Sequence, residues 1–225
     1  MPLFSPIFFS IVFIGRQNPQ ILNHDFLIRN KVLPVQRQPF KSLIKESSDK
    51  EPPFTEYLST PVVTTLAYKW ISIIVEENRF QIKDSNFKEP LKSPIVSITK
   101  KYFGELLRYT PFRFGGMNFA GKLSFMDEDD ERDFDDRLGI DSKKFETNFK
   151  TKEVRYSSKI SLPWSGGQIE LRVEKPKEGL KDGDMNFNFE YIYEDIDKFI
   201  GKLDEAEKAY RKFNEILNNL KLKRI

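Results

Sequence analysis

The stretch from residue 93 to residue 125, SPIVSITKKYFGELLRYTPFRFGGMNFAGKLSF, limits the possible folds of this chain more than any other. Its first half carries apolar residues three or four positions apart, which predicts one face of a helix. Ser93 can cap this helix, and Pro94 suits its first position, where a missing N–H costs nothing. Pro111 should end the helix, because the residue before a proline avoids the α region.

From Phe112 the apolar spacing changes to two, which predicts a long aromatic strand. Three glycines interrupt this strand, and we expect a structural bend or bulge at Gly115, Gly116 and Gly121. The chain contains 21 phenylalanines. A helix that leads directly into an aromatic strand is therefore expected to form the centre of an aromatic core.

The other strands are predicted from shorter patterns. Residues 7–14 are almost continuously apolar, which is typical of a central strand covered on both faces. This run is too short to span a bilayer and lacks the positive flank of a signal peptide, so we expect a core strand. Residues 62–82 predict a hairpin that turns near Glu77, and residues 154–193 predict a three-stranded meander.

A long helix is predicted from Asp195 to Leu220, because its apolar residues recur in steps of four and three. We expect its first two-thirds to pack on the sheet of its own chain. Its end is expected to overhang the domain and contact a partner through three leucines: Leu217, Leu220 and Leu222.

This order of elements predicts the α+β class, with a mostly antiparallel sheet, a central helix and a long C-terminal helix packed on it. We expect residues 1–225 to form a single domain. Two segments should lie outside its core: a long, proline-rich surface connection at 36–60 and an acidic excursion at 127–150.

The acidic excursion begins with eight carboxylates between Asp127 and Asp136, although the whole chain has a net charge of +3. Phe134 and Leu138 are four positions apart, which predicts a short surface helix with few apolar anchors. Two or three of these carboxylates could hold Mg²⁺ or Ca²⁺, but the spacing of an EF-hand is absent. We interpret the block as a solvated face and expect neither a metal nor a cofactor.

The composition narrows the chemistry of the chain. Without cysteine, thiolate nucleophiles, disulfides and cysteine metal sites are excluded. The only histidine, His24, cannot build a multi-histidine metal site, and we expect an ordinary polar residue. The glycines at 115–121 lack the lysine and serine or threonine of a phosphate-binding loop.

Basic and aromatic residues alternate in three places, at residues 100–102, 108–109 and 112–114. Such a pattern can bind single-stranded nucleic acid through stacking and charge. Here the aromatic residues follow the period of the core, so nucleic acid is the weaker interpretation.

Two segments, TPVVTTLAYKWISIIVEENRFQI and PIVSITKKYFGELLRYTPFRFGGMNFAGKLSF, resemble a group of uncharacterised bacterial soluble proteins. In that group a strand with a similar ENR-x-QI turn precedes a helix and a TP…G-x-NF strand. The resemblance covers roughly residues 60–125. It implies a bacterial origin and an α+β domain, and it supplies no catalytic residues.

These observations favour a non-enzymatic protein of the bacterial cytoplasm that acts by binding another protein or itself. A small apolar-ligand carrier is the alternative, because a meander closed by a long helix is similar to helix-grip folds with an internal cavity. A carboxylate- and Mg²⁺-dependent enzyme is the third interpretation.

Overall fold

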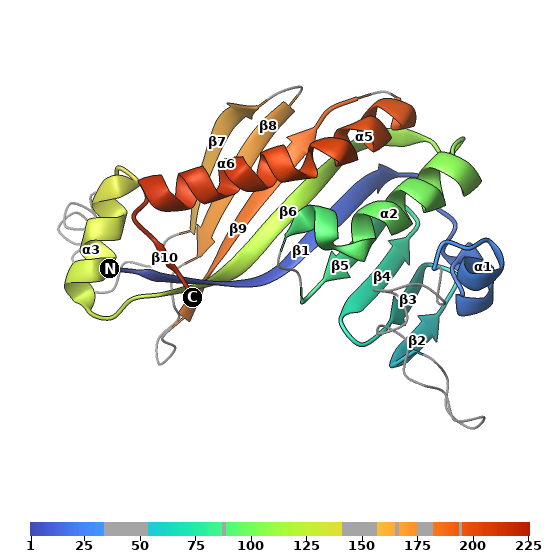
Figure 1. Cartoon of the computed structure of the whole chain (residues 1–225), viewed down its shortest axis with the longest axis horizontal. Coiled ribbons are helices and arrows are strands. Elements are labelled where there is room, and N and C mark those ends of the chain that lie inside the picture. The colour runs from blue at the N-terminus through green and yellow to red at the C-terminus, as the bar shows by residue number, and fades with distance from the viewer. Residues whose placement is uncertain (34–53, 87–88, 141–156, 165–166, 175–181, 194) are drawn as a thin grey trace.

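Two strands of 13 residues each, β1 (Leu3–Gly15) and β6 (Phe112–Ser124), pair antiparallel at the centre of a large sheet in this computed structural model (Figure 1). The structure describes residues 1–33, 54–86, 89–140, 157–164, 167–174, 182–193 and 195–225. Within this part of the chain, ten strands form one sheet of order β2-β3-β4-β5-β1-β6-β9-β8-β7, and β10 lies beside β1. The predicted α+β class with a mostly antiparallel sheet is confirmed, since only β10 pairs in parallel.

The remaining strands are short to medium in length. They are β2 (Glu56–Ser59), β3 (Val63–Ala67), β4 (Ile71–Glu76), β5 (Arg79–Asp84), β7 (Ser157–Trp164), β8 (Gly167–Glu174), β9 (Asp182–Tyr191) and β10 (Lys223–Arg224). The predicted hairpin is the β4–β5 pair, in which Glu76 lies opposite Arg79. The predicted meander is β7–β8–β9.

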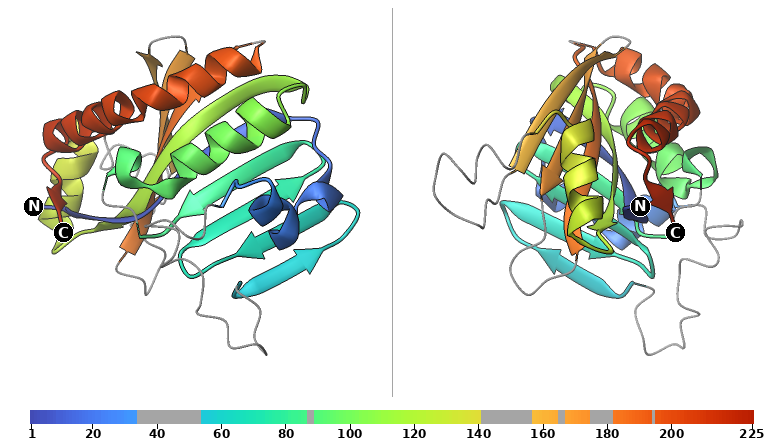
Figure 2. Two further views of the ribbon diagram at one scale, coloured as in Figure 1. Left: turned by 45° about the vertical axis from the view of Figure 1, so that its right-hand side comes forward. Right: turned by 90° about the vertical axis from the view of Figure 1, so that its left-hand side faces the viewer.

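Three α-helices of the described chain lie on one face of the sheet, as the two turned views show (Figure 2). They are α2 (Pro94–Lys101), which continues into a π-helical turn (Tyr102–Leu106), and α5 (Ile196–Lys202), which a 3₁₀ turn (Leu203–Glu205) joins to α6 (Ala206–Asn219). The other two α-helices of the described chain lie at the ends of the sheet: α1 (His24–Arg29) and α3 (Glu128–Arg137). In the described part of the chain, no helix is both long and apolar enough to cross a membrane.

The two halves of the sheet repeat one order of elements, although no sequence repeat predicts it. Each half starts with a long central strand, continues through a meander and ends in helix on the same face. The last strand of each meander pairs with its own long strand, β5 with β1 and β9 with β6. The halves meet where β1 pairs with β6, and the stacked rings of Phe9 and Phe119, 5.1 Å apart, lie opposite each other near the middle of that pair.

Aromatic rings fill the space between the central strands and the helices. Phe13 of β1 stacks on Phe103 of the π-helical turn at 4.1 Å. Phe119 of β6 stacks on Phe213 of α6 at 5.1 Å, and the Phe187 ring of β9 meets Phe213 edge-on at 4.9 Å. These five side chains are fully buried. The phenylalanine surplus therefore serves the interface between sheet and helices.

The glycines of β6 let other groups approach its backbone. The strand is continuous, and the pairing with β1 shifts register between Pro6 and Phe8, opposite Gly121. A Cβ on Gly121 would lie 2.4 Å from the ring of Phe4. A Cβ on Gly115 would lie 2.4 Å from the ring of Phe199 in α5. Glycine is needed at these positions because other groups approach closely. It is not needed for a positive φ, since the one described glycine with a positive φ is Gly139.

The predicted long C-terminal helix is confirmed from Ile196 to Asn219, with a 3₁₀ turn between α5 and α6. Two other expectations need correction. The strand predicted at 7–14 is covered by helices on one face only: Ile11 is fully buried on that face, whereas Val12 on the other face is half-buried. Of the connection expected at 36–60, residues 36–53 lie outside the described chain, and 56–59 form the edge strand β2.

The fit of Phe199 against Gly115 gives a stability prediction with a matched control. Gly115→Ala should lower the free energy of unfolding by more than about 1 kcal/mol, because the new methyl group and the ring cannot share one space. Gly201→Ala is the control, because no atom lies within 4 Å of the ideal Cβ at this position of α5. It should raise the free energy of unfolding by up to about 1 kcal/mol. Urea denaturation measures both, and equal stability of the Gly115 variant and the wild type would contradict this packing.

Candidate functional site

The sheet has a second face on which no described helix lies, and we call it the open face. Five adjacent strands, β5, β1, β6, β9 and β8, line a hollow of about 240 Å³ on this face. Its most distinctive side chains are carboxamides, so we call it the carboxamide hollow: Gln81, Asn118, Asn186 and Asn188. Phe8 and Phe114 line it as well, and Phe114 is 37% exposed.

The register of the strands brings these polar side chains together. Ser10 of β1 lies opposite Asn118 of β6, which lies opposite Asn188 of β9, which lies opposite Glu170 of β8. Residues directly opposite each other have Cβ atoms about 5 Å apart. One polar row therefore crosses four strands, and its members alternate along each strand with core residues such as Phe119.

Gly116 makes room for one carboxamide of this row. A Cβ on Gly116 would lie 2.5 Å from Oδ1 of Asn188. The neighbouring Gly115 accommodates the Phe199 ring on the opposite face of the same strand. The glycine pair thus lets an aromatic ring approach β6 from the helix side and an amide approach it from the open face.

Two buried polar atoms in the hollow have no hydrogen-bond partner among the described residues. They are Oγ of Ser10 and Oδ1 of Asn186. Leaving a buried donor or acceptor unpaired costs about 1–3 kcal/mol, so most such atoms in proteins are bonded. Both atoms are shielded from solvent, so the donors and acceptors that the hollow offers to a ligand are those of the half-buried Asn118 and Asn188.

A charged cluster borders the hollow on the β7–β8 side. Glu170 is 5% exposed, contacts the ammonium group of Lys159 and accepts a 2.5 Å hydrogen bond from Nε of Arg172. Burial opposes the ionised form of Glu170, but the hydrogen bonds from Lys159 and Arg172 outweigh it and lower the pKa of this carboxyl group. Glu170 is therefore a fixed, ionised group held by two cations, which suits positioning and does not suit proton transfer at neutral pH.

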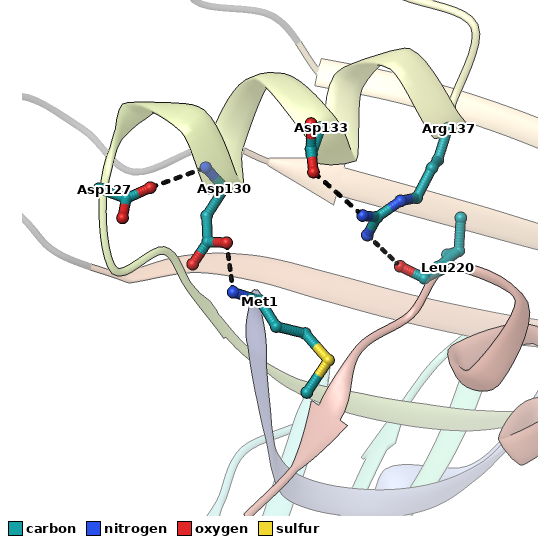
Figure 3. Close-up of polar contacts among 6 residues, drawn as sticks. All are labelled: Met1, Asp127, Asp130, Asp133, Arg137 and Leu220. Carbon is teal, nitrogen blue, oxygen red and sulfur yellow. Dashed lines mark hydrogen bonds and ion pairs between the residues drawn. The ribbon is translucent and has the colours of Figure 1, made fainter.

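The acidic block forms α3, and its carboxylates serve structural contacts (Figure 3). Asp127 caps the helix by accepting a 2.8 Å bond from the backbone N–H of Asp130. The side chain of Asp130 pairs with the N-terminal ammonium group of Met1. Arg137 forms a 3.4 Å ion pair with Asp133 and donates a 3.0 Å hydrogen bond to the carbonyl oxygen of Leu220.

The structure therefore ties α3 to both ends of the described chain, which corrects the expectation of a loosely attached surface helix. Phe134 is fully buried and packs against Phe125, with ring centres 5.6 Å apart. The rest of the excursion, 141–150, lies outside the described residues. Within the part of the chain that the structure describes, no three metal-ligating side chains converge.

The leucines expected to contact a partner are buried within the chain. Leu217, Leu220 and Leu222 are 2%, 8% and 6% exposed. Lys223 and Arg224 form β10 beside β1, and this pairing folds the end of the chain back onto the sheet. The overhang predicted for this end is thus wrong, and these leucines offer no contact surface in this arrangement.

The other residues singled out in the sequence are dispersed. His24 starts α1 and shares a 3.0 Å hydrogen bond between its Nδ1 and the hydroxyl group of Tyr68; burial lowers the pKa of this histidine, against an opposing effect of Asp25. Tyr102 is buried in the core, so it cannot stack on a base. Phe114 reaches the carboxamide hollow and Arg113 lines a neighbouring one.

Comparison with known proteins adds no functional assignment, since neither the protein-family models nor the curated proteins include a match to this chain.

Ser10→Ala tests whether the hydroxyl group in the hollow is unpaired. The free energy of unfolding of the variant should equal that of the wild type or exceed it by up to about 1 kcal/mol, because the substitution removes a buried polar atom that has no partner. Thr99→Val is the matched control, since Oγ1 of Thr99 is also buried and unpartnered but lies in α2 on the helix side. Urea denaturation measures this difference. If Ser10→Ala lowers the free energy of unfolding by more than about 1 kcal/mol, the hydroxyl group is hydrogen-bonded in the folded protein.

Glu170→Gln should show a pH-dependent loss of stability. Because the folded state lowers the pKa of Glu170, its ion pairs stabilise the fold above the ordinary pKa of glutamate, about 4.3, and this contribution disappears as the pH falls through the lowered value. The variant should be about 1–3 kcal/mol less stable than the wild type at neutral pH, and the gap should close in acid.

The control for this experiment is Glu174→Gln, on the same strand and face but exposed, which should change the unfolding free energy by less than about 0.5 kcal/mol. Denaturant titrations of all three proteins across acidic and neutral pH make the comparison. A gap that widens in acid would contradict the assigned direction of the pKa shift.

Proposed function

We propose that the protein is a non-enzymatic interaction protein of the bacterial cytoplasm that binds another protein through the carboxamide hollow of its open face. The observation that carries this proposal is that three carboxamides from adjacent strands, Asn118, Asn186 and Asn188, converge at one hollow. Asn118 and Asn188 are half-buried, so their amide groups are open to a ligand on this face.

The shape of the hollow suits a group that projects from a protein partner. Its volume of about 240 Å³ fits one side chain or a short turn that projects from a larger surface. Carboxamides also match a peptide chain chemically, because each offers one acceptor and two donors to a backbone amide.

The other two functions considered for the sequence have less support. The aromatic rings between the sheet and the helices occupy the place where a helix-grip carrier would hold an apolar ligand. The carboxylates of α3 at Asp127, Asp130 and Asp133 are engaged in a cap or in ion pairs. Self-association through the C-terminal leucines is not supported, because those side chains are buried within the chain.

The resemblance of residues 60–125 to uncharacterised bacterial proteins supports the bacterial part of the proposal, and a chain without cysteine suits a reducing compartment. Neither point identifies the partner, so the test has to isolate it.

A differential capture experiment tests the proposal. Immobilised wild-type protein and the double variant Asn118→Ala/Asn188→Ala are exposed to the same bacterial lysate. A protein retained only by the wild type is then purified and titrated by calorimetry. We expect the double variant to bind it at least tenfold more weakly, because two hydrogen bonds worth about 1 kcal/mol each are lost.

Asn219→Ala is the control, since Asn219 is exposed on α6 at the far face; it should leave the affinity unchanged. The melting temperature of the double variant must match that of the wild type. The proposal is contradicted if the purified partner binds the wild type and the double variant equally well. It is also contradicted if native mass spectrometry shows a small molecule that co-purifies with the wild type alone.

A further inference from the structure

A second hollow, of about 580 Å³, adjoins the carboxamide hollow. Ile14 of β1 lines both. Two arginines, Arg16 and Arg113, are among the residues that line the second hollow, and we call it the arginine hollow. No function considered so far uses it.

Local backbone packing brings the two arginines to the same hollow. An ideal Cβ on Gly15 would lie only 2.0 Å from the carbonyl oxygen of Pro111, so the end of β1 and the start of β6 are in close contact. The pairing of these strands shifts register between Ile14 and Gly15, which leaves Arg113 as the extra residue of a bulge. Bulges re-aim side chains at strand ends, and here both arginines are exposed.

The charges at this hollow are not balanced. Neither Arg16 nor Arg113 forms an ion pair within the described chain. Glu77 is the one carboxylate that lines the hollow, so a single positive charge is left over. The amide side chains of Asn18 and Asn78, which also line the hollow, can hydrogen-bond to an anion.

The rest of the open face decides between one anionic group and a polyanion. Beyond the arginine hollow, Lys159 and Arg172 of this face are paired with Glu170, and Lys122 is paired with Asp184. The successive phosphates of a nucleic acid strand would have to compete with these carboxylates for the cations. One carboxylate placed at the arginines needs no such exchange.

We propose that the two hollows form one site for a peptide segment of the partner protein that carries an aspartate or glutamate side chain. The carboxylate lies between Arg16 and Arg113, whose guanidinium groups can each donate two hydrogen bonds to it. The neighbouring polar part of the segment lies in the carboxamide hollow and bonds to the amide groups of Asn118 and Asn188. This assignment rests on the proposed function and adds the chemistry of its ligand.

The test uses the full chain, labelled with ¹⁵N, and two short probe peptides: acetyl-Asn-Asp-Ser-amide and its neutral counterpart acetyl-Asn-Asn-Ser-amide. We expect the acidic peptide to shift the Nε–Hε signals of Arg16 and Arg113 together with the side-chain amide signals of Asn118 and Asn188. The neutral peptide should shift the asparagine signals alone and bind about tenfold more weakly, because it lacks the charge that pairs with the two arginines.

Arg16→Gln/Arg113→Gln should bind the acidic peptide no better than the neutral one, and its melting temperature should not change. Arg108→Gln is the control, because Arg108 is equally exposed but lies beside Asp197 of α5, at 4.0 Å, and it should leave the affinity of the acidic peptide intact. If inorganic phosphate shifts the arginine signals as strongly as the peptide does, the hollow is a general anion site and the peptide assignment is overturned.

Three further results would overturn the proposal. One is tighter binding of an oligodeoxythymidylate than of the acidic peptide. Another is equal binding of both peptides with shifts only at the asparagines, which would leave the proposed function standing without the carboxylate. The third is the absence of any shift with either peptide at millimolar concentration, which would count against both.

Discussion

Side chains along β1 and β6 alternate between two environments, and the register of this strand pair decides which residue reaches which environment. Phe9 and Phe119 lie opposite each other and pack under the helices, whereas Ser10 and Asn118, one position along, lie opposite each other on the open face. A slip of one residue would bury the polar row and expose the aromatic one. The aromatic core thereby fixes the register, and the register in turn assembles the carboxamide hollow from residues far apart in the sequence.

Neighbouring glycines let the centre of the sheet serve both faces. Gly115 accommodates the ring of Phe199 and Gly116 accommodates the amide of Asn188. Any larger side chain at either position would move a helix or displace a carboxamide. The same strand carries the bulge at Arg113 that leads to the arginine hollow. The start of β6 is therefore where stability and the proposed binding function depend on the same few residues.

The fold class and most of its elements could be predicted from the sequence because their determinants are local. Helical spacing after Pro94, alternation in β6 and β8, and the β4–β5 turn follow from neighbouring residues. The site could not be predicted, since Ser10, Asn118, Asn186 and Glu170 meet only through a strand order that no local pattern encodes. One signal was present: asparagine is depleted in strands, and Asn186 and Asn188 alternate with Met185, Phe187 and Phe189 in β9. The prediction that the C-terminal leucines contact a partner was wrong, because a narrow apolar stripe has the same sequence pattern whether it packs on its own sheet or on a partner.

The central claim is that two carboxamides of the polar row, Asn118 and Asn188, are accessible from water in the free protein. Solvent paramagnetic relaxation of side-chain amide signals, with a soluble gadolinium chelate, measures this directly. The account predicts that the amide groups of Asn118 and Asn188 relax to an extent that approaches that of Asn219, which is exposed on α6. Protection of both amide groups to the level of the backbone N–H of Phe119, which lies in the core, would contradict the account, because the open face would then be closed in the free protein.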